Sequence, residues 1–272
     1  MHCKRLLSQK CNEAKATAKR QPWLGVIVTG LLADQVALAQ CGAQGLVGRL
    51  DQKRAIGKLD HRNVLAARNG LGLGRELGAL LASDECYAEL GWGRWATELI
   101  PTVLDPRVCG DSHEGVLSVY SLSKQSNLAG YRAAFAVGEA NLIKGLVNLR
   151  MHSGLNTPNP VQKAMVVALG DEEHVAVEKE LYRERREVLL GAVREYGFEL
   201  SDSEAGLYLW ATLGQDCWQT VDEMAALGIV VVPGIFYGEA GKNHVRFSIT
   251  ATDAKVAEAA KRLREAAKVK RV

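Results

Sequence analysis

The sequence SLSKQSNLAGYR (residues 121–132) follows an apolar run, GVLSVY (115–120), and sets a single lysine, Lys124, among small hydroxyl residues. A lysine exposed to solvent needs no such setting, and most lysines outside a core are simply solvated. An amine that must lose its proton and attack an aldehyde needs partial desolvation or nearby positive charge. The question is therefore which other residues the fold brings to Lys124.

Predicted strands and helices alternate from about Glu76 onward, which indicates an α/β fold. Residues 1–75 show no sustained helical or strand period, and GLGLG (70–74) lacks the GxGxxG spacing of a phosphate-binding loop. Short apolar or β-branched runs predict strands at 79–83, 115–120, 129–138, 207–213, 229–233 and 244–250. Apolar residues at helical spacing predict helices at 141–151, 171–196, 221–227 and 253–268.

The composition is that of a globular protein: 47% of the 272 residues are apolar and 24% are charged. The net charge of +3, from 34 basic and 31 acidic residues, is too even to indicate a nucleic-acid partner. Six cysteines are spread over the chain without a CxxC motif or a Cys/His cluster, so neither a zinc site nor a disulfide framework is predicted. We therefore expect a cytoplasmic protein without a metal.

An uncharged run, QPWLGVIVTGLLA (21–33), follows a basic stretch and has some resemblance to an export signal. It is short and interrupted by glycine, and a glutamate, Glu13, lies in the long region before it. A buried strand or degenerate sequence is the favoured interpretation over an export signal, and a membrane span is not predicted.

Two predicted strands end at residues that carry chemistry, Asp84 and Lys124. Ligands of open α/β sheets bind beyond the carboxyl ends of strands, so these side chains are expected at one rim of the sheet. Pyridoxal phosphate needs an amine, a carboxylate for its pyridine nitrogen, and hydroxyls and an arginine for its phosphate. The residues that could supply these groups, with a phenol for the ring hydroxyl, are Lys124, Asp84, Ser121, Ser123, Arg132 and Tyr87.

Each of these residues also has a purely structural interpretation. A carboxylate after a strand, such as Asp84, is often a helix N-cap. Arg132 and Arg246, both in predicted strands, could pair with carboxylates at a sheet edge. Tyr87 could belong to the core. The match of several separate positions to one constellation, in order along the chain, favours the functional interpretation.

The motifs DECY (84–87), SLSKQSNLAGYR and VRFSIT (245–250), in this order, resemble the class I/II aminotransferases of the aspartate aminotransferase fold. The resemblance runs from about Glu76 to the C-terminus. It implies the fold of the fold-type I pyridoxal phosphate enzymes, with an incomplete large domain around a mainly parallel sheet and a small C-terminal α+β domain. HEGVLSVYSLSKQSNLAGYR, EAGLYLWAT and VRFSITATD are most similar to the actinobacterial N-succinyldiaminopimelate aminotransferases of lysine biosynthesis.

The resemblance implies a role for each matching residue. Lys124 is expected to form the Schiff base with pyridoxal phosphate and to carry the proton. Asp84 is expected to pair with the pyridine nitrogen and Tyr87 to contact the ring oxygen. Arg246 is expected to bind the substrate α-carboxylate. The phosphate is expected to be held by Ser121, Ser123 and Arg132.

The chain also departs from the family. The family has far more chain before its DECY-like strand than the 83 residues here, and no NPTG-type segment occurs. GLV (45–47) resembles the start of the expected strand, after which the similarity stops. We therefore expect a degenerate or divergent segment at 1–75, the remainder of the cofactor domain at 76–165 and the small domain at 166–272.

Two hypotheses of different class follow. The first is an aminotransferase, a homodimer, that moves an amino group from glutamate to a keto acid, with N-succinyl-2-amino-6-oxopimelate as the expected acceptor. The second is a noncatalytic, truncated remnant of such an enzyme, the product of a decayed or frameshifted gene.

Overall fold

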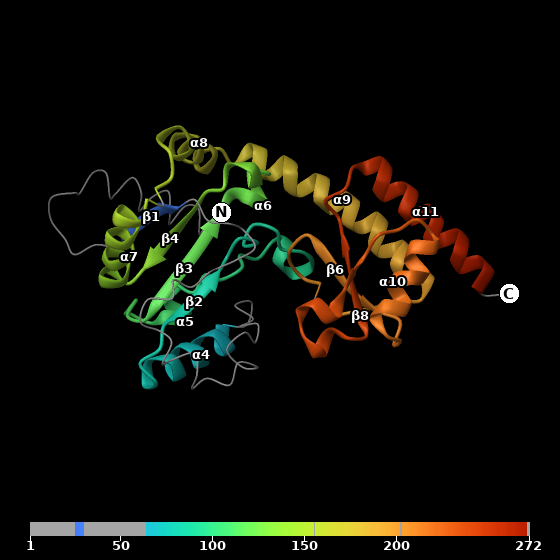
Figure 1. The fold of residues 1–272 in the computed structure, drawn as a ribbon, viewed down its shortest axis with the longest axis horizontal. Coiled ribbons are helices and arrows are strands. Elements are labelled where there is room, and N and C mark those ends of the chain that lie inside the picture. Colours follow the sequence, from blue (N-terminus) through green and yellow to red (C-terminus); the bar gives the residue numbers. More distant parts are fainter. Residues whose placement is uncertain (1–24, 30–63, 155, 202, 271–272) are drawn as a thin grey trace. The chain divides into compact units, whose positions relative to one another are not determined.

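The structure is a computed structural model that describes residues 25–29, 64–154, 156–201 and 203–270 (Figure 1). Most of the predicted N-terminal segment, including GLV (45–47), lies outside the described residues. The chain divides into two compact units, which are described separately below. Unit 1 comprises Met1–Glu89 and Leu99–Val175, and unit 2 comprises Leu90–Glu98 and Ala176–Val272.

Unit 1 is built around a four-stranded sheet in the order β1 (Gly25–Thr29), β4 (Ala134–Gly138), β3 (Val116–Ser121) and β2 (Leu81–Asp84). β2 and β3 are parallel, whereas β4 runs antiparallel to both β3 and β1. The described sheet is therefore mixed, where the resemblance implied a mainly parallel one. The strand β1 falls within the uncharged run at 21–33, for which a strand was one of the expected structures.

Helices cover both faces of this sheet (Figure 1). Ile143 of α7 (Ala140–Ser153) packs with Ala136 on one face. On the other face, Met165 of α8 (Asn159–Gly170) packs with Tyr120 and Phe135. Polar residues that follow the strands are therefore left at the sheet rim rather than on its covered faces.

α4 (Val64–Glu76) was not predicted, because it contains the three glycines of GLGLG, which disfavour helix. Its Ala67 and Leu71 are buried in a cluster with Val108 of α5 (Pro106–Cys109). This packing outweighs the low intrinsic propensity, since tertiary contacts supply most helical stability in proteins. GLGLG is thus part of a helix and not a phosphate-binding loop.

The predicted strand at 129–138 is shorter in the structure. Its first part is a 3-10 turn, Ala129–Tyr131, and Arg132 follows with a left-handed φ of 51°. A residue in that conformation cannot continue an extended strand, so β4 begins only at Ala134. The helix α8 was also not predicted.

Unit 2 contains an antiparallel sheet in the order β5 (Glu199–Leu200), β6 (Tyr208–Thr212), β8 (His244–Ser248) and β7 (Val232–Pro233). The predicted strand at 229–233 is thus reduced to two residues. The helices that the unit contains or shares are α9 (Glu173–Tyr196), α10 (Cys217–Ala226) and α11 (Asp253–Lys270), with 3-10 turns at Gly93–Ala96, Gly234–Tyr237 and Glu239–Gly241. The units divide after Val175, within α9, whereas the predicted domain boundary follows residue 165.

The two faces of the unit 2 sheet differ in burial. Leu209 and Ala211 of β6, and Val245 and Phe247 of β8, are almost fully buried. The alternate residues of the same strands, which include Arg246, are partly exposed. An antiparallel sheet with one covered face gives this alternation. Arg246 therefore lies on the more open face of the sheet.

In the part of the chain that the structure describes, no helix is long and apolar enough to cross a membrane.

Candidate functional site

The first candidate site lies at the carboxyl ends of β2 and β3. Asp84, the last residue of β2, is paired in register with Val119 of β3, and the backbone N–H of Glu85 donates to Val119 O (2.9 Å). Because the two strands are parallel, both end at the same edge. The structure thus brings Asp84 to the same rim as Ser121 and the turn that carries Lys124.

Lys124 lies on α6 (Leu122–Gln125), a single helical turn that begins directly after β3. Ser121 is its N-cap: the Ser121 Oγ accepts from the Ser123 backbone N–H (3.1 Å) and lies 2.7 Å from the Ser123 Oγ. Both serines are only 7% exposed. The Lys124 Nζ lies 6.0 Å from the centroid of the Tyr87 ring. Two buried hydroxyls and an amine are therefore gathered at one turn, with the Tyr87 ring beside the amine.

Cys86, for which no role was predicted, lies close enough to Asp84 and Lys124 for both to affect the pKa of its thiol. Its backbone N–H donates to Asp84 Oδ1 (3.1 Å). Burial, together with the hydrogen bond and charge of Asp84, raises the pKa of the Cys86 thiol to about 12, while the Ser121 backbone and the Lys124 charge act in the opposite direction. Asp84 and Lys124 thus both act on one thiol. This thiol stays protonated near neutral pH.

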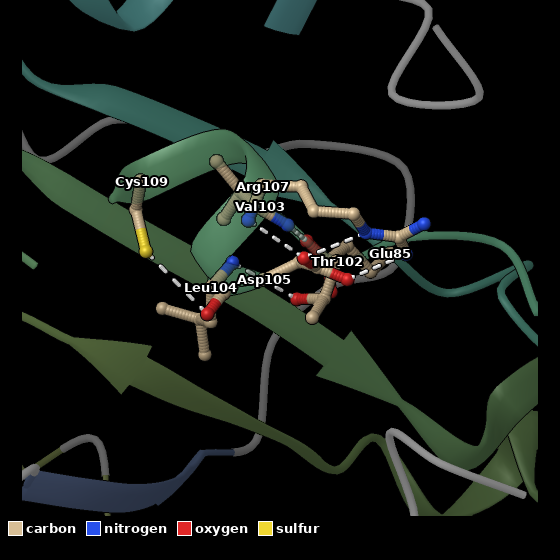
Figure 2. A network of polar contacts seen from close by, with 7 residues as sticks. All are labelled: Glu85, Thr102, Val103, Leu104, Asp105, Arg107 and Cys109. Carbon is tan, nitrogen blue, oxygen red and sulfur yellow. Dashed lines mark hydrogen bonds and ion pairs between the residues drawn. The ribbon is translucent and has the colours of Figure 1, made fainter. Parts of the chain in front are cut away.

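The second residue of DECY has a structural role instead. Glu85 is 2% exposed, and its Oε1 accepts from the backbone N–H of Val103 (2.7 Å). Figure 2 shows Glu85 beside the loop in which Asp105 caps α5 and bonds Arg107. Of the two adjacent carboxylates, only Asp84 is left for a ligand at the rim.

The backbone that follows Arg132 is hydrogen-bonded to Ser121. Ser121 Oγ donates to Ala133 O (3.1 Å), the carbonyl of the residue after Arg132. The guanidinium of Arg132 donates from Nη1 to Ala129 O (2.8 Å), and the residue is exposed. Its side chain is therefore in contact with its own turn, while the two serines are buried.

The second candidate site is around Arg246 in unit 2. Arg246 is paired with Trp210 of β6 and Val232 of β7. Its guanidinium carbon lies 4.0 Å from the centroid of the Tyr208 ring and 5.2 Å from that of Tyr237. Among the described residues, its buried Nε has no hydrogen-bond partner. A partly exposed guanidinium with an unpaired donor of this kind is suited to an anionic ligand such as a carboxylate.

Other aromatic residues surround Arg246 that sequence reasoning did not single out. His244 stacks on Trp210, with ring centroids 5.3 Å apart and an interplanar angle of 10°. Trp210 also meets Tyr237 edge-on at 5.6 Å. His244 thus forms part of an aromatic group with Trp210 and Tyr237. The period-2 pattern of β6 and β8 was the available signal, since it puts these residues on one face.

Comparison with protein families matches residues 72–263 to the family described as aminotransferase class I and II. The chain is 52% identical over 189 residues to the 4-dedimethylamino-4-oxo-anhydrotetracycline transaminase OxyQ of Streptomyces rimosus, covering 70% of this chain and 52% of the relative. It is 48% identical over 189 residues to the probable aminotransferase Rv1178 of Mycobacterium tuberculosis, covering 70% and 44%.

Among solved structures, an aminotransferase from Neisseria meningitidis has a TM-score of 0.68 at 27% identity, covering 75% of this chain and 53% of that one. A probable N-succinyldiaminopimelate aminotransferase from Thermus thermophilus has a TM-score of 0.64 at 30% identity, covering 75% and 54%. The chain spans about half the length of the curated relatives it matches.

Proposed function

The chain belongs to the class I and II aminotransferases, a family dependent on pyridoxal phosphate, and on that premise we propose that it transfers amino groups between an amino acid and a keto acid, with Lys124 as catalytic residue. The observation that carries the proposal is the convergence of Lys124, Asp84 and Tyr87 at one edge of the unit 1 sheet.

The donor set at this edge fits pyridoxal phosphate. Asp84 offers a carboxylate for the pyridine nitrogen, and Tyr87 offers a phenol for the ring oxygen. The hydroxyls of Ser121 and Ser123 would donate to the phosphate after giving up their present bonds to Ala133 O and to each other, and Arg132 would add a charged fork. The Lys124 amine on the same turn is the group that would bond to the aldehyde.

The bound cofactor supplies an electron sink that stabilises negative charge at the substrate Cα. Lys124 would move the proton, since a positioned amine can take a proton from the substrate Cα and deliver it to the aldehyde-derived carbon of the cofactor. The Asp84 carboxylate would accept a hydrogen bond from the pyridine nitrogen and so favour a proton there.

Arg246 is proposed to bind the substrate α-carboxylate. Its planar guanidinium can donate two parallel hydrogen bonds to a carboxylate, and its buried Nε has no partner among the described residues. The rings of Tyr208 and Tyr237 limit the directions in which the guanidinium can turn.

For the substrates, we propose glutamate as amino donor and N-succinyl-2-amino-6-oxopimelate as acceptor. The similarity to the Thermus thermophilus structure supports this choice. The more similar Streptomyces rimosus relative is named for a tetracycline-type ketone, so a polycyclic ketone is the competing acceptor. Comparing the two acceptors at equal concentration, with glutamate as donor, decides between them.

The test is an absorbance spectrum of the full chain with added pyridoxal phosphate, before and after borohydride. We expect a cofactor band that borohydride fixes to the protein, and peptide mass spectrometry should locate the adduct on Lys124. Lys124→Ala should lose both. The matched control is Lys144→Ala, an exposed lysine on α7, which should keep both.

A wild-type chain that shows no specific band contradicts the proposal and favours the noncatalytic remnant. Oligomeric state, measured by sedimentation with and without cofactor, tests the proposed homodimer.

A further inference from the structure

A chain of side-chain hydrogen bonds runs from the core of unit 1 to its surface beside Lys124. Tyr120 Oη bonds to Gln125 Oε1, and Gln125 Nε2 donates to Ser126 Oγ (3.2 Å). Ser126 Oγ lies 2.8 Å from His174 Nε2, and His174 Nδ1 lies 3.1 Å from Asp171 Oδ2. The five residues belong to two stretches of the sequence, 120–126 and 171–174.

The direction of this chain follows from what each group can donate. The Asp171 carboxylate only accepts, so His174 Nδ1 carries a proton, and in the neutral ring Nε2 then accepts from the Ser126 hydroxyl. Ser126 Oγ in turn accepts from Gln125, whose amide oxygen accepts from Tyr120. From Tyr120 to Asp171, each side chain therefore donates a hydrogen bond to the next one. No two donors and no two acceptors face each other in this series.

Both ends of the chain are anchored. Tyr120, in β3, is 3% exposed and lies 5.3 Å from the Phe135 ring. Asp171 uses its other oxygen, Oδ1, to accept the backbone N–H groups of Glu173 and His174 at the start of α9. The His174 N–H is the main reason why the pKa of Asp171 is lowered from its ordinary value, which favours the charged carboxylate.

Gln125 and Ser126 follow Lys124 directly in the sequence. The hydrogen bonds that hold these two side chains therefore also fix the turn that carries the Lys124 amine. Gln125 is 1% exposed, whereas Lys124 is partly exposed. Neighbouring side chains on a helix point about 100° apart, so holding Gln125 in the core sets the direction of Lys124. Ser121 caps the other end of the same turn.

We propose that this hydrogen-bond chain positions Lys124, and that His174 is the positioning residue on which it depends. His174 is the only member outside 120–126 that contacts Ser126 in the described part of the chain, and it ties α6 to the first turn of α9. The inference rests on the proposed function in that Lys124 is the catalytic amine there. Ser126, His174 and Asp171 also stand in the order of a nucleophilic triad, but the Ser126 oxygen is occupied by Gln125.

The test measures the reactivity of the Lys124 amine in the full chain without cofactor. Trace acetylation by acetic anhydride is followed at each lysine by peptide mass spectrometry, with exposed Lys144 as the internal reference. We expect His174→Ala and Ser126→Ala to raise the Lys124 rate about fivefold to tenfold relative to Lys144, because loss of one hydrogen bond lets the turn open more often. His174→Gln, whose amide oxygen can accept from Ser126, should stay within about twofold of wild type.

An unchanged Lys124 rate in both alanine variants overturns the proposal. Equal increases at Lys124 and Lys144 also overturn it, because they indicate general loosening. The readout needs no pyridoxal phosphate, so it is independent of the proposed function. A chain that fails to bind the cofactor can still show the effect, and one that binds it can still lack the effect.

Discussion

Lys124 and Arg246, the two residues on which the proposed chemistry depends most, are held in different ways. Lys124 lies on the single turn α6, whose two ends are fixed by the side chains of Ser121 and Gln125. Arg246 lies in the middle of β8, whose backbone is paired on both sides, and aromatic rings including that of Tyr208 surround its guanidinium.

The difference predicts where each site is sensitive to substitution. A turn held by polar side chains moves when one of them is lost, since each supplies a bond that the backbone does not. A strand held by two neighbours keeps its course when a side chain changes, so substitutions near Arg246 should alter what the guanidinium contacts rather than where the backbone runs.

The largest expected effect is at Arg246. If it binds the substrate carboxylate, Arg246→Ala should weaken substrate binding by about 3 kcal/mol, a factor of about 100. The measurement is the KM for glutamate in the half-reaction. Arg246→Lys keeps the charge without the fork and should recover only part of the loss. An unchanged KM for Arg246→Ala would remove Arg246 from the site while leaving the role of Lys124 intact.

A smaller effect tests the grouping of Asp84, Lys124 and Cys86 at the edge of the unit 1 sheet. Asp84→Asn removes the charge that helps to raise the Cys86 pKa, so the thiolate fraction at pH 8 should grow about tenfold. Lys124→Ala should lower that fraction, because the lysine charge acts in the opposite direction. Iodoacetamide labelling of the Cys86 peptide measures both, with the buried Cys217 of unit 2 as reference. Shifts in the same direction for both variants would contradict the grouping.

Next in size is the aromatic contact of Arg246. Tyr208→Leu removes a ring whose cation–π contact contributes about 1 kcal/mol, so substrate binding should weaken about fivefold. Tyr208→Phe keeps the ring and should bind like wild type. The circular dichroism spectra of the two variants should agree, and their unfolding temperatures should differ by no more than a few degrees, because the paired backbone is unchanged. A loss of folding in Tyr208→Leu would contradict the contrast drawn between the sites.

The smallest expected effect concerns Asp171. Its pKa is lowered below the ordinary 3.8 in the folded chain, so it stabilises the fold above that value and loses the contribution as pH falls through the lower, folded pKa. Asp171→Ala should therefore be less stable than wild type at pH 6 and approach it at strongly acid pH. Urea unfolding across this range gives the comparison. Asp171→Asn, which can still cap α9, should lie between the two. A constant difference at all pH values would contradict the assignment.

Sequence reasoning predicted the parts of the site that depend on where each strand ends. It predicted that Asp84 and Lys124 lie beyond strand ends at one rim, and the parallel pairing of β2 and β3 brings them there. It missed His174, which contacts Ser126 across 48 residues of chain. It also missed α4, whose glycines conceal a helix that forms because Ala67 and Leu71 are buried.

The sequence by itself determined the family, the order of most strands and helices, and the chemical groups available to the site, because short motifs and periodicity are local properties of the chain. Only the tertiary structure decided how those groups are used. It set Asp84 at the rim and buried its neighbour Glu85 against Val103, and it joined Gln125 and Ser126 to His174. These choices depend on contacts between distant segments, and such contacts exist only once the core has packed.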